Sequence, residues 1–269
     1  MQLIRLVRDD FDFFCPVTGK AVYTEGEVTA SSFCGAWSDM VPEEPADLHP
    51  ELQQAWDLYW NKMQDNDGDL DFAALVSQEE EEVIAFENLG DGLVNAKRHW
   101  IFSSSNFDLG TAGMVATDLD QDGDQDFLVA IGDNLELINN AAQPWHGVKW
   151  LENKGDWIFE SHQIASVGGI YGVAPADFDG DGDIDVAAVS IFNDWSQENA
   201  ASVVWLENDG NQNFLTWQVA SEPIQLSCVT CGDVNNDGTP DIVTGSFHFR
   251  RPYSKFGSID AFFNPARGK

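Results

Sequence analysis

Short apolar runs alternate with polar turns along most of the chain, and their length and composition predict β-strands. The runs "FLVAI" (127–131), "VAAVSI" (186–191) and "DIVTG" (241–245) are rich in β-branched and small residues. A short apolar run bounded by glycine and aspartate is typical of a strand that is buried on both faces. Helical periodicity is absent from these stretches, which favours an all-β fold.

A second apolar pattern recurs at a fixed period. It consists of an aromatic residue followed by Glu-Asn, a glycine two residues later and then a short polar strand. Asn-x-Gly predicts a turn, because both residues tolerate left-handed backbone conformations. Each unit of about 56 residues then corresponds to four antiparallel strands, with "FLTWQVA" (214–220) grouped with the strands that follow it. The copies are "VIAFENLG" (83–90), "VKWLENKG" (148–155), "VVWLENDG" (203–210) and the worn "DAFFNPARG" (260–268), in which Phe263 replaces the glutamate.

Acidic loops connect two strands within each unit. Residues 118–126, 177–185 and 233–241 carry aspartate or asparagine at alternate positions around a central glycine. Residues 63–71 form a weaker copy, because Met63 stands in the first position. The copies begin 55, 59 and 56 residues apart, which is typical of a repeat architecture. Carboxylates this close together repel one another, so such a loop is costly unless a cation binds it.

Calcium is the cation that suits these loops. It takes about six to eight oxygen ligands, and the glycine permits the sharp turn that wraps the loop around the ion. We expect side-chain oxygens from positions one, three, five and nine and a backbone carbonyl from position seven. The alternative is a solvated acidic turn, but the repetition favours three calcium ions, with a fourth in the weaker copy. The expected ligands are Asp118, Asp120, Asp122, Asp124 and Asp126; Asp177, Asp179, Asp181, Asp183 and Asp185; Asp233, Asn235, Asp237, Thr239 and Asp241; and, in the weaker copy, Asp65, Asp67, Asp69 and Asp71.

These loops differ from EF-hands. An EF-hand loop has a glutamate at position twelve and helices on both sides, whereas position twelve here is Val129, Ala188 or Thr244 and the flanks predict strands. The pattern D-x-D-x-D-G-x-x-D, combined with "W-L-E-N-x-G", resembles the FG-GAP/VCBS repeat family of calcium-binding β-propellers over roughly residues 61–269. The resemblance implies calcium loops between the first two inner strands of a blade. It also implies a binding or adhesion module that is secreted or displayed at the cell surface.

The repeats predict a propeller-like array of about four four-stranded blades. Residues 61–88 supply part of one unit, and further units cover about 89–153, 154–208 and 209–264. Either the N-terminal segment closes a compact four-unit structure, which we favour, or the ring is incomplete. An incomplete ring exposes a strand edge that invites self-association, or makes the chain a fragment or subunit of a larger propeller.

Residues 1–60 lack the repeat signature and form either a small cap or a degenerate blade. Within the N-terminal segment, "HPELQQAWDLYWNKM" (49–63) predicts an amphipathic helix. A Cys15–Cys34 disulfide would fit an oxidising compartment. Cys228 and Cys231 have the spacing of a redox motif but fall in a predicted strand. They are small core residues, a bonded pair, or half of a zinc site with the other two cysteines.

The balance of charge limits the classes of partner. The sequence has 46 acidic and 13 basic residues, which gives a formal net charge of −33. This charge argues against nucleic acids and anionic membranes as partners, and no apolar stretch is long enough to insert into a bilayer. The start "MQLIRLVRDDFDFF" becomes acidic by Asp9 and does not match a signal peptide, in contrast to the location that the resemblance implies. The sequence therefore does not determine the cellular compartment of the protein.

No catalytic constellation is recognisable in the sequence. It contains no Gly-x-Ser-x-Gly elbow, phosphate loop or His-Glu-x-x-His motif. His99 and His162 occupy one repeat position, which predicts a structural role. Trp150 and Trp205 likewise share one position, which predicts blade core.

We expect a protein or glycan partner to bind at the loops. Trp145, Trp157 and Trp195 lie near loops and are candidates for a binding face, whereas the basic cluster 250–255 either grips an anionic ligand or balances the neighbouring acidic loop. We expect a non-catalytic binding, adhesion or scaffolding module with structural calcium. The rival is a polysaccharide-acting lyase or hydrolase on the same scaffold. That rival requires acid, base and arginine side chains that converge in a pocket outside the calcium loops.

Overall fold

The structure of the chain is a computed structural model. It describes residues 13–14, 21–23, 71–77, 81–89, 96–106, 108–134, 142–247 and 257–265. The chain divides into two compact units, Met1–Asp57 and Leu58–Lys269, and each is described by itself. In the first unit, β1 (Phe13–Phe14) pairs antiparallel with β2 (Ala21–Tyr23). The predicted helix 49–63, Cys15, Cys34, Asp65, Asp67, Asp69 and the basic cluster 250–255 lie outside the described residues.

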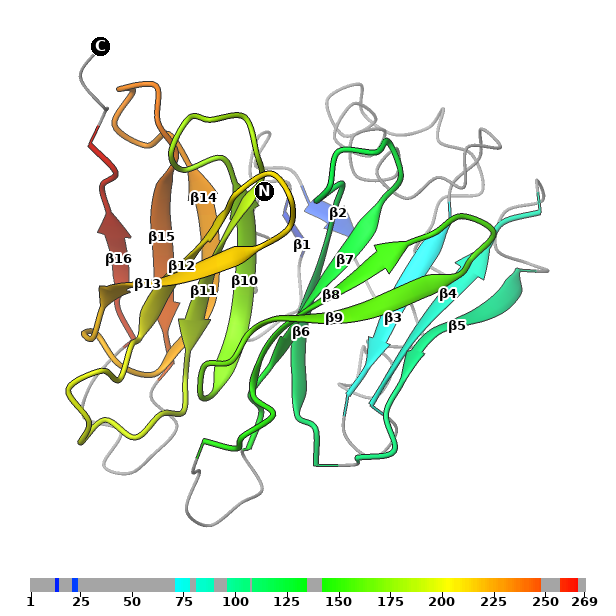
Figure 1. Ribbon diagram of the computed structural model, residues 1–269, viewed down its shortest axis with the longest axis horizontal. Helices are drawn as coiled ribbons and strands as arrows, with labels where there is room; N and C mark the ends of the chain where they lie inside the picture. Colours follow the sequence, from blue (N-terminus) through cyan, green and yellow to red (C-terminus); the bar gives the residue numbers. More distant parts are fainter. Residues whose placement is uncertain are drawn as a thin grey trace. The chain divides into compact units, whose positions relative to one another are not determined.

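The second unit contains four antiparallel sheets whose strands follow one another in chain order (Figure 1). The all-β, propeller-like array is thereby confirmed, and the described residues of this unit contain no helix. Nor is there, within the part of the chain that the structure describes, a helix long and apolar enough to cross a membrane. The sheets are β3 (Phe72–Val76), β4 (Glu82–Glu87) and β5 (Lys97–Ser103); β6 (Thr111–Thr117), β7 (Asp126–Ile131), β8 (Gly147–Asn153) and β9 (Phe159–Ala165); β10 (Ile170–Ala176), β11 (Asp185–Ser190), β12 (Val203–Asn208) and β13 (Phe214–Ala220); and β14 (Leu226–Gly232), β15 (Asp241–Ser246) and β16 (Ile259–Phe262).

The grouping of strands differs from the expected one by a single strand. "FLTWQVA" is β13, and it pairs with β12 before it rather than with the strands that follow it. The same holds for β9, which pairs with β8. The reason is the Asn-x-Gly turn, because a turn this short joins neighbouring antiparallel strands into a hairpin. Each of the first three sheets therefore ends with the polar strand that was expected to begin the next unit.

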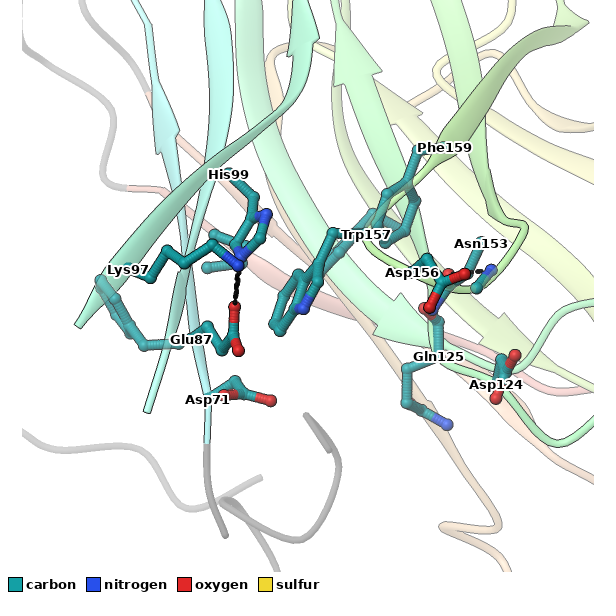
Figure 2. A pocket seen from close by; sticks show the side chains of 15 residues that line it. Asp71, Glu87, Lys97, His99, Asp124, Gln125, Asn153, Asp156, Trp157 and Phe159 are labelled. Carbon is teal, nitrogen blue, oxygen red and sulfur yellow. Dashed lines mark hydrogen bonds and ion pairs between the residues drawn. The ribbon is translucent and has the colours of Figure 1, made fainter. Parts of the chain in front are cut away.

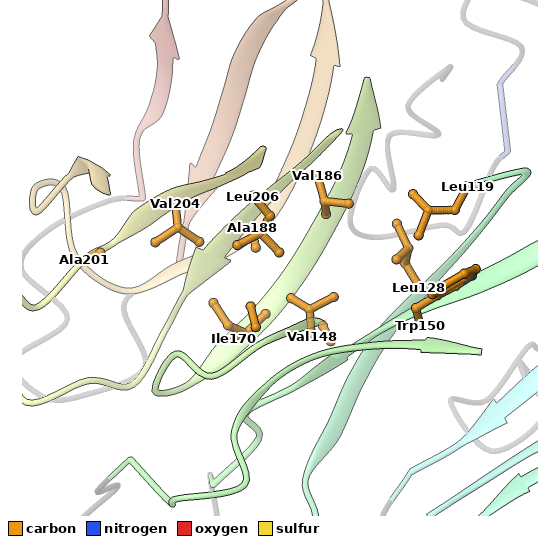
Figure 3. Packing of buried hydrophobic residues seen from close by; sticks show 12 residues of the cluster. Leu119, Leu128, Val148, Trp150, Ile170, Val186, Ala188, Ala201, Val204 and Leu206 are labelled. Atoms are coloured by element: carbon orange, nitrogen blue, oxygen red, sulfur yellow. The ribbon is translucent and has the colours of Figure 1, made fainter. Parts of the chain in front are cut away.

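Alternate residues of the second strand in a sheet contact different neighbouring sheets. All six residues of β7 are buried, as are all six of β11. Leu128 of β7 belongs to one apolar cluster with Val186 and Leu206 of the third sheet (Figure 3). Phe127 and Val129 instead pack with Val83 and Ala85 of the first sheet. Because side chains alternate across a strand, both faces of β7 are covered, which explains its continuous apolar sequence.

Two buried polar side chains hold the connecting segments. The Glu81 carboxylate accepts hydrogen bonds from the Gly110 and Thr111 backbone N–H groups at 3.2 and 2.9 Å and from the Thr111 hydroxyl at 2.6 Å. His146 accepts the backbone N–H of Gly169 at Nδ1, at 3.0 Å. Burial lowers the pKa of His146 to about 4, so the ring is neutral at pH 7. These contacts fix the chain between the first and second and between the second and third sheets.

Candidate functional site

The acidic loops join the first two strands of three sheets. The ninth position of each loop is the first residue of the following strand, β7, β11 or β15. Strands on both sides of each loop agree with the sequence analysis and differ from an EF-hand. Gly123, Gly182 and Gly238 have φ values of 103°, 100° and 90°. Glycine adopts this left-handed conformation without steric cost, so the central residue of each loop permits the sharp turn.

One hydrogen-bond pattern recurs in all three loops. The first-position aspartates Asp118, Asp177 and Asp233 accept the N–H of the central glycine at 3.1, 3.1 and 2.9 Å. The side chains in positions three and five each accept the N–H two residues further on. The acidic side chains therefore fold back over the loop instead of extending into solvent.

This folding brings carboxylate oxygens together in two loops. In each of these loops, one oxygen from each of three aspartates lies within 4.8 Å of the other two. In the first of them, Asp118 Oδ1 is buried and has no hydrogen-bond partner. A buried anionic oxygen without a partner is destabilising, and a bound cation would satisfy it. The two sets are Asp118, Asp120 and Asp122, and Asp177, Asp179 and Asp185.

The other two copies differ in detail. In the loop 233–241, Asn235 Nδ2 donates to Asp237 Oδ2 at 3.1 Å, so an amide occupies the place of a carboxylate. The Thr239 hydroxyl donates to Asp237 at 2.5 Å. Of the weaker copy, the structure describes only Asp71, which is buried and accepts the backbone N–H of Asn88 at 2.8 Å.

The ninth-position aspartate is the most buried acidic residue of each loop. Asp126, Asp185 and Asp241 are at most 1 % exposed. One carboxylate oxygen accepts the N–H of the second loop position, and the other accepts the N–H of the motif asparagine, at 2.7 to 3.1 Å. Burial raises the pKa of Asp126 and Asp185 to about 6, although these N–H groups favour the ionised form. The aspartate thus links its loop to the third strand of the same sheet.

The motif asparagine, which the sequence pattern predicted only as a turn residue, also contacts the acidic loop. Asn208 donates its backbone N–H to Asp185 at 2.8 Å and its Nδ2 to the Ile184 carbonyl at 3.2 Å. Its Oδ1 accepts the Gly210 N–H at 3.2 Å, which forms the turn. The acidic loop and the Glu-Asn motif recur with the same period, and this was the sequence signal that the two are in contact. The equivalent partners are Asp126, Gln125 and Gly155 for Asn153, and Asp241 and Pro240 for Asn264.

The donor set fits a hard cation. The three described loops offer carboxylate, amide and carbonyl oxygens, which are the ligands that calcium prefers. The buried Asp118 oxygen and the converging aspartates are the observations that support this fit.

A cleft of about 500 Å³ with both polar and apolar lining lies between the first two sheets (Figure 2). Its wall includes the Trp157 ring, which stacks on His99 with centroids 4.5 Å apart and planes 11° apart. Glu87 accepts hydrogen bonds from Lys97 at 3.1 Å and pairs with His99 at 2.5 Å. Asp156 and Trp157 both have positive φ, 52° and 62°, and Gln212, at the repeat position of Trp157, has 58°, so this conformation is a feature of the repeated turn. The cleft therefore presents an aromatic ring beside several polar groups.

The pair in the cleft has a counterpart in the next sheet. His162 Nε2 lies 2.8 Å from Glu152 Oε2, and these two residues occupy the repeat positions of His99 and Glu87. In the third sheet the position of the histidine is held by Trp217, whose Nε1 donates to the motif glutamate at 2.5 Å. A cross-strand contact to the motif glutamate is thus a repeated feature of the fold.

The remaining candidates have varied surroundings. Trp150 is 5 % exposed in the core, and Trp205 is partly buried against the core that the third and fourth sheets share. Of the loop tryptophans, Trp157 lines the cleft, whereas Trp145 donates Nε1 to the Asp108 carbonyl at 2.9 Å. Cys228 and Cys231 are free thiols, and burial raises the pKa of Cys231 to about 12, which makes it inert.

Comparison with known proteins agrees with this geometry. A family model described as "FG-GAP-like repeat" matches residues 65–129, 134–188 and 189–244, more than half of the chain. A separate comparison with curated proteins found no match. Each matched range contains one complete acidic loop near its end, and the matches end 59 and 56 residues apart, which is the spacing of these loops. The chain therefore belongs to the FG-GAP-like repeat family.

Proposed function

We propose that this protein is a non-catalytic binding module whose FG-GAP-like repeats are stabilised by calcium. The observation that carries the proposal is the convergence of three aspartates in each of two loops, together with the unpartnered, buried Asp118 oxygen. The repeats themselves form a propeller-like array, an architecture suited to presenting loops to a partner.

Calcium would act by removing repulsion within each loop. Positions one, three and five would supply side-chain oxygens, and position seven, which is Asp124, Asp183 or Thr239, would supply its carbonyl. The ninth-position aspartate would contribute while it keeps its bonds to the third strand. An ion held in this way would connect the first, second and third strands of a sheet and stabilise the folded state.

The cleft between the first two sheets is the proposed place of ligand contact. An aromatic ring beside carboxylates and an amide suits a glycan or a polar segment of a partner protein. Trp157→Ala is expected to remove the aromatic surface without touching an acidic loop. In a screen of glycans and candidate proteins, every ligand that binds at the cleft should bind this variant at least tenfold more weakly. Unchanged binding of all ligands would place the contact elsewhere.

A polysaccharide-acting enzyme is the second candidate, because Glu87, Lys97 and His99 meet in this cleft. Glu152 and His162 form the same pair at a repeat-equivalent position, which favours a structural role for the pair. A catalytic group is not expected to be duplicated in this way. Release of reducing ends from acidic or neutral polysaccharides, abolished in Glu87→Gln, would favour the enzyme instead.

The test of the calcium proposal is a thermal melt of chelator-treated protein against added calcium, with magnesium as control. We expect a rise of the midpoint that is specific for calcium, and at least two bound ions by calorimetry. Asp179→Asn should lose one ion, whereas Glu198→Gln, an exposed change outside the loops, should keep all of them. No calcium-specific shift, or equal stoichiometry in the two variants, would contradict the proposal.

A further inference from the structure

We infer that Glu152, Glu160 and His162 form a second type of cation site, one for a transition-metal dication such as Zn²⁺. The three residues lie on the hairpin of β8 and β9, outside the acidic loops. One potential ligand atom from each residue lies within 4.8 Å of the other two. Within the part of the chain that the structure describes, this is the one such cluster that contains a histidine.

The pairing of β8 with β9 brings these groups together. Glu152 lies directly opposite Glu160, and Trp150 lies opposite His162, so the three side chains share one face of the hairpin. Two like charges directly opposite each other are destabilising in an antiparallel pair. His162 Nε2 is 2.8 Å from Glu152 Oε2. A metal ion bound by both atoms at about 2.0–2.2 Å needs only a small separation of them.

The other sheets provide an internal comparison. In the first sheet the residue opposite the motif glutamate Glu87 is Lys97, which pairs with it at 3.1 Å. In the third sheet the residue opposite Glu207 is Leu215. Only the second sheet, among the described ones, has a carboxylate in this position together with the histidine. The first sheet thus has a built-in cation where the second has a second anion.

The surroundings leave room for an ion. Lys154 pairs with Oε1 of Glu152, so Oε2, the oxygen beside His162, is available without displacing the lysine. Glu152 and His162 also line a cavity of about 790 Å³, whose other wall includes Asn213 and Phe214. Three protein ligands and an open side are typical of zinc sites that keep a position for water or a ligand.

The imidazole nitrogen decides the type of metal. Calcium and magnesium prefer oxygen donors, whereas a histidine with two carboxylates suits zinc, cobalt or nickel. The acidic loops contain oxygen donors alone, so the two types of site should discriminate between the metals. Saturating calcium is expected to leave this hairpin accessible to zinc.

The experiment is a calorimetric zinc titration of the full chain in saturating calcium, with histidine imidazole resonances followed by NMR. We expect one zinc ion per chain to bind with the highest affinity and to shift the resonances of one histidine, which His162→Gln removes. Glu160→Lys reproduces the arrangement of the first sheet and should weaken this binding at least tenfold. The control Glu198→Gln, which removes an exposed charge elsewhere, should not change it.

Circular dichroism shows whether each variant is folded, and substitutions of the exposed Glu160 and the partly exposed His162 are expected to be tolerated. Equal zinc affinity in the wild type, Glu160→Lys and His162→Gln would overturn the inference. So would zinc binding that shifts no histidine resonance, because that result would place the ion away from the hairpin, in the acidic loops or at the cysteines. Failure of this test would leave the calcium proposal untouched, since the two use different residues.

Discussion

Replacement of Asn208 by alanine tests the connection between an acidic loop and the third strand of its sheet. Asn208 is 2 % exposed, and its side chain makes two hydrogen bonds, to the Ile184 carbonyl and from the Gly210 N–H. Each such bond contributes about 0.5–1.5 kcal/mol net, so Asn208→Ala should lower the free energy of unfolding by about 1–3 kcal/mol. This is a substantial part of the roughly 5–15 kcal/mol that is typical of a domain.

The assay is urea denaturation followed by tryptophan fluorescence, first with chelator and then with calcium. We expect the loss in both conditions, and a higher calcium concentration for half-saturation, because the loop carbonyl and the ninth-position aspartate lose support. Asn153→Ala, the equivalent change in the second sheet, should behave alike. Asn211→Ala, at an exposed position of the same turn, should cost less than about 0.5 kcal/mol. The reasoning is refuted if Asn208→Ala and Asn211→Ala have equal effects.

Three further predictions concern buried ionisable groups. Burial raises the pKa of Asp126 and Asp185 from 3.8 to about 6, so the folded state binds protons that the unfolded state has lost. Chelator-treated protein should therefore lose stability as the pH rises from about 4 to 6. Urea denaturation of the wild type and of Asp185→Asn measures this loss, which should be absent in calcium. The pKa of His146 is lowered from 6.5 to about 4, so its contribution to the free energy of unfolding has the opposite sign. In calcium, stability should fall by up to about 3 kcal/mol as the pH falls from 6.5 to 4. The stability of His146→Gln should depend less on pH. Glu81→Gln should lower the free energy of unfolding, measured by urea denaturation, by about 1–3 kcal/mol, because it alters a buried acceptor of three hydrogen bonds. Glu82→Gln is the control, because that side chain is partly exposed. An equally small loss of stability in the two variants would argue against the structural role of Glu81.

The strands and loops followed from local patterns in the sequence. The runs 127–131 and 186–191 are apolar at every position but one, and the structure buries both faces of these strands. The alternating aspartates around Gly123 and Gly182 predicted tight loops between strands, and the left-handed glycines confirm them. Calcium binding by these loops stays a prediction.

The pairing of strands and the contacts between sheets were harder to predict from the sequence. From the repeat period, "FLTWQVA" was expected to group with the following strands, although the Asn208-x-Gly210 turn requires it to pair with the preceding one. The cleft also lay beyond the sequence, because it joins residues of different sheets, such as Glu87 and Trp157. No local sequence pattern indicates which two repeats lie next to each other or which of their side chains are in contact.

The sequence by itself determined the features that recur within one repeat: strand length, turn position and the spacing of acidic groups. These depend on backbone conformation and on the alternation of side chains, both of which act over a few residues. Only the tertiary structure decided which partners those residues meet. It brought the motif asparagine to the acidic loop, Trp157 to His99 and Glu160 to Glu152. Such contacts depend on strand register and on sheet packing, which are set by burial across the whole unit rather than by neighbouring residues.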